Sequence, residues 1–153
     1  MRREALLVSA CLLGENCKYN GGNNALSPEE LKALEERFRL VPVCPERDGG
    51  LPTPRLPSER RSGGVFNRAG EDVSAPFERG AALALKLAEE QDCRAALLKE
   101  RSPSCGSGLV YDGSFTGKLI PGDGLTAALL KEHGLAVFSE TRLRELLERE
   151  EES

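Results

Sequence analysis

The order of the apolar segments constrains the fold of this chain more than any other feature. Short apolar runs at residues 5–8, 40–43, 95–98 and 135–138 alternate with stretches of helical periodicity. Such alternation is typical of α/β folds with a largely parallel sheet, in which each short run is a buried strand. We therefore predict an α/β fold with a mostly parallel sheet.

The helical stretches carry start and stop signals. Ser27-Pro28-Glu29-Glu30 combines an N-cap serine, a proline at the first helical position and a capping-box glutamate. From Pro76 onward, apolar residues recur at the spacing of one helix face. Two further helices are predicted, at residues 123–133, stopped by Gly134, and at residues 139–149.

Three segments fall outside this alternation. Residues 45–75 are rich in Pro, Gly and Arg, so we predict a long loop, whose closely spaced prolines favour a stiff lid. Residues 109–111 and 114–116 flank Asp112-Gly113, a pair suited to a tight hairpin turn. Residues 148–153 form an acidic tail, expected as a solvated helix end. With 153 residues, the chain is expected to be a single domain spanning residues 1–153.

Composition and charge exclude some partners and compartments. The net charge is −4, Trp is absent and there are two Tyr, so nucleic acid is an unlikely partner. No apolar run approaches the roughly 20 residues of a membrane span. Met1-Arg2-Arg3 imitates the start of a signal peptide, but only Ala5–Val8 follows as an apolar core, so we expect a cytoplasmic protein. The sequence does not indicate an oligomeric state.

Three of the five cysteines each follow a predicted strand: Cys11, Cys44 and Cys105. Ligands gather outside the carboxyl ends of parallel strands, so these thiols are expected to meet at one sheet edge. Cys93 precedes a strand, where a buried structural role is expected. Cys17 could line the same pocket, serve as a spare redox thiol or fill space.

The chemistry of three convergent thiols leaves two metals open. No CxxC motif occurs and the only histidine, His133, ends a predicted helix, which disfavours a structural zinc site, although a catalytic three-thiolate zinc is conceivable. Soft thiolates also favour iron-sulfur clusters, and three of them on a cubane leave one iron without a protein ligand. No GxGxxG follows the first strand, so no dinucleotide cofactor is expected.

Several long motifs resemble, in order, one bacterial family, the iron-sulfur-dependent thiouracil desulfidases, formerly a domain family of unknown function. They are SACLLG, CKYNGG, VCPERDGGLPTPR, LLKERSPSCGSG, YDGSFTGKLIPGDG and LTAALL. The resemblance covers almost the whole chain. It implies a Rossmann-like, three-layer domain that removes sulfur from a small thiolated heterocycle such as thiouracil, giving uracil and sulfide. The chain departs from the family's pattern at Ser58 and in a shortened stretch after Glu59.

The resemblance also implies roles for individual residues. Cys11, Cys44 and Cys105 would hold a 4Fe-4S cluster with one iron lacking a protein ligand, a cluster prone to loss in air. Glu46 would be an acid/base residue and Ser102 a hydroxyl near the substrate.

Each of these residues also has a structural alternative. Glu46 could form a loop salt bridge and Ser102 could cap a turn. Arg55 is a candidate for binding an anionic intermediate, although with Arg60 and Arg61 it could belong to a solvated charged patch. A noncatalytic iron-sulfur sensor or sulfur carrier is the rival interpretation of the whole chain.

Overall fold

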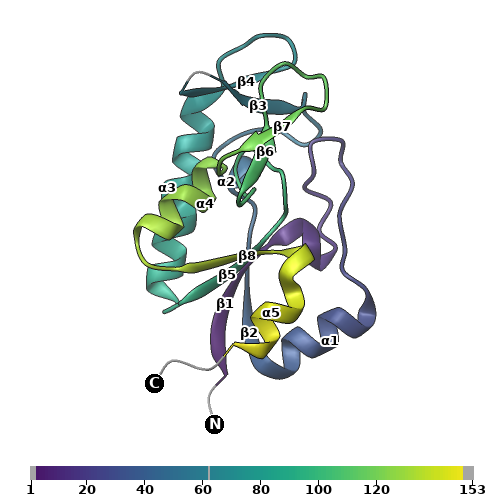
Figure 1. Ribbon diagram of the computed structural model, residues 1–153, viewed down its shortest axis with the longest axis vertical. Helices are drawn as coiled ribbons and strands as arrows, with labels where there is room; N and C mark the ends of the chain where they lie inside the picture. Colours follow the sequence, from purple (N-terminus) through teal and green to yellow (C-terminus); the bar gives the residue numbers. More distant parts are fainter. Residues whose placement is uncertain (1–2, 62, 150–153) are drawn as a thin grey trace.

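A four-stranded parallel sheet forms the centre of the computed structural model, which describes residues 3–61 and 63–149 (Figure 1). The strand order is β2-β1-β5-β8. The strands are β1 (Glu4–Ser9), β2 (Phe38–Val43), β5 (Ala95–Leu98) and β8 (Ala136–Ser139), and all neighbours pair in parallel. The predicted α/β fold with a mostly parallel sheet is confirmed.

The alternation of side chains along the strands buries both faces of this sheet. In β1, Ala5 and Leu7 point to one face, which the helices α3 (Ser74–Glu90) and α4 (Leu125–Glu132) cover. Leu6 and Val8 point to the opposite face, beneath α1 (Pro28–Arg37) and α5 (Leu143–Glu148). The result is three layers, with helices on both sides of the sheet (Figure 1).

The helix signals in the sequence operate as predicted. The Ser27 side chain accepts a hydrogen bond from the Glu30 N–H, and the Glu30 carboxylate accepts one from the Ser27 N–H, which completes a capping box at α1. Gly134 follows α4 with a φ of +88°. A 3₁₀ turn, Glu140–Arg142, precedes α5 and occupies part of the helix expected at residues 139–149. Most of the predicted acidic tail, residues 150–153, lies outside the described residues.

The prediction of a long loop at residues 45–75 is wrong in part, because this segment contains regular structure. This segment contains the helical turn α2 (Pro45–Asp48) and an antiparallel hairpin of β3 (Ser58–Arg61) and β4 (Gly64–Asn67). Its Gly and Pro content signals the turns between these elements. Both strands are four residues long, and three residues of β3 are charged. Short strands with charged residues lack the apolar alternation on which sequence-based prediction depends.

The second hairpin also differs from its prediction. β6 (Leu109–Tyr111) forms as expected, but it pairs with β7 (Leu119–Pro121) and not with residues 114–116. Residues 112–118 form a loop in which the Asp112 carboxylate accepts hydrogen bonds from the N–H and hydroxyl of Ser114. This side-chain bond to the backbone stabilises a wider turn than the two-residue turn that Asp-Gly suggests.

Both hairpins stand above the carboxyl ends of the parallel strands, and β3 contacts β6 (Figure 1). Below them, α2 lies against α3 at two glycines. A Cβ added at Gly49 would lie 2.0 Å from the Pro76 carbonyl oxygen, and one at Gly80 would lie 1.9 Å from that of Pro45. Only glycine permits this approach, which fixes α2 at the sheet edge. No helix in the described part of the chain is long and apolar enough to cross a membrane.

Candidate functional site

A cavity of about 660 Å³ opens between the carboxyl edge of the sheet and the two hairpins. This volume is typical of small-ligand sites. Its lining includes every residue that the sequence singled out for chemistry: Cys11, Cys44, Glu46, Arg55, Ser102 and Cys105. The strand-end argument therefore placed the three thiols correctly around one space.

Cys11 lies on a 3₁₀ turn, Ala10–Leu13, that follows β1 directly. Gly14 ends this turn with a φ of +95°, a left-handed conformation that favours glycine. The Asn24 side-chain amide donates a hydrogen bond to the Cys11 sulfur at 3.5 Å. Burial raises the pKa of the Cys11 thiol, and the Asn24 bond and the Lys99 charge oppose that rise only in part.

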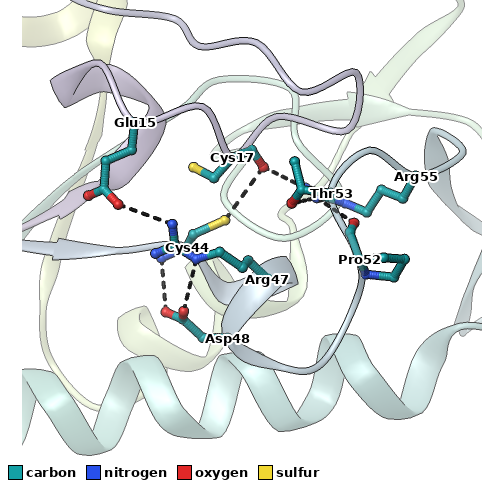
Figure 2. Close-up of polar contacts among 8 residues, drawn as sticks. All are labelled: Glu15, Cys17, Cys44, Arg47, Asp48, Pro52, Thr53 and Arg55. Carbon is teal, nitrogen blue, oxygen red and sulfur yellow. Dashed lines mark hydrogen bonds and ion pairs between the residues drawn. The ribbon is translucent and has the colours of Figure 1, made fainter.

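Cys44 stands between the end of β2 and the start of α2. Its N–H donates to the Asp48 carboxylate at 3.1 Å, and its thiol donates to the Cys17 carbonyl oxygen at 3.8 Å (Figure 2). Cys17 is 3% exposed and lines the same cavity, which was one of the three roles that the sequence left open for it. Burial, followed by the neighbouring Cys44, raises the pKa of the Cys17 thiol to about 12.

Cys105 is held by a turn that Ser102 organises. The Ser102 hydroxyl oxygen accepts hydrogen bonds from the N–H groups of Cys105 at 3.0 Å and Ser104 at 3.1 Å. Gly106 completes the turn, because a Cβ there would lie 2.6 Å from the Ser102 carbonyl oxygen. Cys105 is 6% exposed, and burial raises the pKa of its thiol against a weaker opposing hydrogen bond from Ser9.

Glu46 and Arg55 form an ion pair inside the cavity wall, with Arg55 Nε 3.2 Å from Glu46 Oε1. The Glu46 side chain retains 18% exposure toward the cavity, and the Arg55 side chain retains 7%. Burial raises the pKa of Glu46, while the charge of Arg55 and hydrogen bonding with Arg55 and Ser102 oppose the rise. Glu46 thus has the salt bridge that the sequence left open as its structural role.

Arg55 uses most of its guanidinium N–H groups in hydrogen bonds within the protein. Besides Glu46, it donates to the Pro52 carbonyl and the Thr53 hydroxyl, each at 3.1 Å, and to the Cys17 carbonyl at 3.0 Å (Figure 2). A guanidinium has five N–H groups, so four are engaged. Arg55 is therefore a clamp between the Cys17 loop, the 52–55 loop and Glu46, and not part of a solvated patch.

The other two arginines of the suggested patch also have partners. Arg60 donates a hydrogen bond to the Asp123 carbonyl, and the guanidinium of Arg61 lies 5.8 Å from the centre of the Phe66 ring. The alternative of a solvated charged patch formed by Arg55, Arg60 and Arg61 is therefore wrong, because the Arg55 side chain is buried.

Sequence reasoning missed several residues that line the cavity. Lys99 follows β5 directly, so the strand-end argument applied to the thiols could have found it; its Nζ lies 2.9 Å from the Glu140 carboxylate. Others come from irregular segments and from the hairpins: Tyr19, Glu59, Arg68, Tyr111 and Phe115. The sequence indicated a hairpin around Asp112-Gly113 but no cavity-lining role for Tyr111 or Phe115. Cys93 lies in the core cluster, 7% exposed, as predicted.

The donor set fits a group larger than one ion. Among residues 3–61 and 63–149, no three Cys, His, Asp or Glu side chains gather closely enough to hold a single metal ion. Zinc binds thiolates at about 2.3 Å, which draws its ligands to one point. Three thiols spread around one cavity, with Cys44 and Cys105 buried and Cys11 partly buried, suit an iron-sulfur cluster instead, because its thiolate ligands attach to different irons.

The fold and the site together define the class of the protein: an α/β protein with three strand-end thiols around one cavity at the edge of the sheet. The family model described as 2-thiouracil desulfurase matches residues 6–142. The chain therefore belongs to the 2-thiouracil desulfurase family.

Two individual proteins show how close this relationship is. The solved structure of the [4Fe-4S]-dependent thiouracil desulfidase TudS is similar, with a TM-score of 0.90 and 51% identity, covering 94% of this chain and 95% of that one. The uncharacterized protein YbbK of Bacillus subtilis (strain 168) is 43% identical over 152 residues, which cover 93% of this chain and 99% of YbbK.

Proposed function

We propose that this chain is a 4Fe-4S-dependent desulfidase that hydrolytically removes sulfur from a small thiolated heterocycle such as thiouracil, giving uracil and sulfide. The observation that carries the proposal is the convergence of three strand-end thiols and a carboxylate–hydroxyl pair on one cavity. Its support from outside the chain is the family membership and the likeness to TudS.

Cys11, Cys44 and Cys105 are the residues that would hold the cluster, leaving one iron without a protein ligand. When bound, such a cluster supplies a soft Lewis acid for the sulfur of a thiocarbonyl group. The protein contributes burial of the thiols, and the Asn24 amide and the Ser9 hydroxyl stabilise charge on Cys11 and Cys105. Cys17 stays next to Cys44 without being needed as a ligand in this assignment.

Glu46 and Ser102 are proposed to handle the water and the protons. Replacing C=S by C=O requires one water, whose oxygen stays on the ring carbon while sulfur leaves as sulfide. Glu46 would accept a proton from that water or donate one to the ring, and the Ser102 hydroxyl would orient the water or the base edge. Arg55 contributes mainly by fixing the Glu46 carboxylate, and its one uncommitted N–H is available to an anionic group.

The structural roles of Ser102 and Glu46 are compatible with these functions. Ser102 uses hydroxyl lone pairs for the Cys105 turn and keeps its O–H for Glu46 or substrate. The same hydroxyl therefore links a proposed cluster ligand to the proposed acid/base residue. A sensor or carrier requires only the ligands, so the Glu46–Ser102 contact favours an enzyme.

The test is reconstitution of the purified protein with iron and sulfide in the absence of oxygen. We expect four irons and four sulfides per chain, as a 4Fe-4S cluster contains, and loss of thiocarbonyl absorbance with release of uracil when 2-thiouracil is added. A cluster without turnover on 2-thiouracil or 4-thiouracil would favour the sensor or carrier. Stoichiometric zinc without a cluster would contradict the proposal altogether.

The partners and location that we propose follow from this chemistry. The partner is a small heterocycle and not a nucleic acid, and the chain works in the cytoplasm, where thiols stay reduced. Fractionation and a binding assay with thiolated RNA would test both. Stable binding of thiolated RNA would contradict the first.

A further inference from the structure

The wall of the cavity opposite the sheet edge is aromatic and comes from the hairpins. Tyr111 ends β6, and Phe115 lies in the loop between β6 and β7; both line the cavity. Neither belongs to the proposed cluster-binding or acid/base groups. The cavity therefore has a thiol side and an aromatic side.

Glu59 holds the loop that carries Phe115. Its side chain belongs to β3, and the residue is only 9% exposed. One carboxylate oxygen, Oε1, accepts hydrogen bonds from the Gly113 N–H at 2.9 Å and the Phe115 N–H at 3.2 Å. This buried carboxylate belongs to one hairpin and accepts hydrogen bonds from the backbone of the other. It therefore fixes the position of the loop that carries Phe115.

The backbone of this loop is unusual for the residues it contains. Phe115 has a φ of +59°, a left-handed conformation that is uncommon for a bulky residue. Three non-glycine residues in the described ranges have a positive φ, and two of them, Arg101 and Phe115, line this cavity. Backbone strain of this kind clusters at ligand sites, where the surrounding structure enforces it.

A cation supports the Phe115 ring. The Arg68 guanidinium lies 5.6 Å from the centre of that ring, and Arg68 also lines the cavity. The arginine supports the ring in a defined orientation. An aromatic face held in this way is a stacking platform for a flat ring.

We propose that Phe115 is a specificity-determining residue whose face receives the ring of the substrate, and that Glu59 is the positioning residue that holds it there. The inference rests on the proposed function and narrows its substrate class to planar cyclic thioamides. An acyclic thioamide such as thiourea offers no ring to stack and is expected to be a much poorer substrate.

The decisive experiment measures binding of uracil, the proposed product, to the reconstituted protein by equilibrium dialysis. Phe115→Leu is expected to weaken uracil binding about tenfold or more, the loss of one base–aromatic contact. Phe66→Leu is the matched control, because the Arg61–Phe66 pair is a similar contact outside the cavity lining. It is expected to leave uracil binding unchanged.

Glu59 is tested by a conservative and a disruptive variant. Glu59→Gln keeps an oxygen that accepts both N–H groups, so uracil binding is expected to be retained. Glu59→Ala removes the acceptor and is expected to raise KM for 2-thiouracil more than it lowers kcat. If Glu59→Ala does not fold, Phe115→Leu against Phe66→Leu still decides the proposal.

The outcomes separate this inference from the proposed function. Uracil binding that depends on Phe115, without sulfide release from any thiobase, would contradict the proposed function but support the stacking role of Phe115. If the protein turns over 2-thiouracil normally, and Phe115→Leu binds uracil as tightly as the unaltered protein does, the stacking role of Phe115 is overturned and the proposed function is not. An unchanged preference for 2-thiouracil over thiourea in Phe115→Leu would also overturn it.

Discussion

The parallel sheet and the pair of hairpins above it are stabilised by different kinds of interaction. In the sheet, β1 and β5 are buried on both faces, and apolar packing on α1, α3, α4 and α5 fixes the strand ends. In the hairpins, side chains bond to the backbone: Glu59 holds the 112–118 loop and the Asn67 amide oxygen accepts two N–H groups within its own turn. The sheet edge carries the thiols, and the hairpins carry the aromatic wall.

This difference separates the residues proposed for chemistry, at the sheet edge, from the residues proposed for substrate recognition, on the hairpins. The thiols proposed to hold the cofactor follow buried strands, whose positions change little without unfolding the core. The aromatic residues proposed to contact the substrate stand on short hairpins, which can vary without disturbing that core. Loss of a thiol at the sheet edge is therefore expected to remove the cofactor, and changes in the hairpins are expected to alter substrate binding.

The largest effect is expected from Cys44→Ser. The thiol is buried and is one of only three proposed ligands, so anaerobic reconstitution should give no intact cluster. Iron and sulfide counts per chain provide the measurement. Cys93→Ala is the control, because Cys93 belongs to the core cluster and not to the cavity of the other four cysteines. Full cluster occupancy in Cys44→Ser would contradict the ligand assignment.

Glu46→Gln is expected to keep the cluster and lose turnover. The amide preserves a hydrogen bond from Arg55 but removes the acid/base group, so kcat should fall by roughly 10²- to 10⁴-fold. Steady-state rates on 2-thiouracil, with the cluster spectrum recorded in parallel, give the answer. Glu15→Gln, in an exposed ion pair with Arg47, should match the unaltered rate. An unaltered kcat in Glu46→Gln would rule out the acid/base role.

Gly80→Ala tests how the core fixes α2 at the sheet edge. The added Cβ would lie 1.9 Å from the Pro45 carbonyl oxygen, so α2 and α3 must separate. We expect the free energy of unfolding to fall by about 1–3 kcal/mol, as overpacking does elsewhere, and kcat to fall with it. Urea denaturation measures the first quantity. Leu83→Ala, at a residue 43% exposed on the same helix, serves as control, and equal stability of both variants would refute the close contact.

Gly113→Ala perturbs only the hairpin side. Gly113 has a φ of +95°, and a Cβ there would lie 2.7 Å from the Arg61 Cβ. The loop should shift and raise KM for 2-thiouracil by about tenfold, the equivalent of 1.4 kcal/mol of lost binding, with the iron content unchanged. Kinetics and iron analysis on the same sample make the comparison. Loss of the cluster in this variant would show that the two regions are not independent.

The smallest effect is expected from Ser27→Ala, which removes the capping box of α1 on the side of the sheet away from α2. Loss of an N-cap hydrogen bond costs about 1 kcal/mol of stability. Urea denaturation should show that decrease, while kcat and KM for 2-thiouracil stay as they are. A changed KM would indicate that α1 influences the cavity.

Sequence patterns predicted the sheet and its helices because local chemistry encodes them. Apolar runs defined β1, β2, β5 and β8, and the Ser27 capping box defined the start of α1. The same patterns failed for β3, whose four residues are polar or charged, and for β7, whose three residues are too few to show a period. The positions of the thiols were predictable because each follows a strand. The expected roles of Glu46 and Ser102 came from the resemblance to a family, and that of Arg55 came from its charge within the predicted lid.

The sequence by itself determined the succession of strands and helices along the chain, the burial of the strands and the delivery of Cys11, Cys44 and Cys105 to one edge. These follow from hydrophobic periodicity and from the geometry shared by parallel sheets. Only the tertiary structure decided that Arg55 clamps Glu46, that Glu59 holds Phe115, and that two hairpins complete the cavity. Those contacts join residues distant in sequence through single hydrogen bonds, and such bonds leave no periodic trace in the chain.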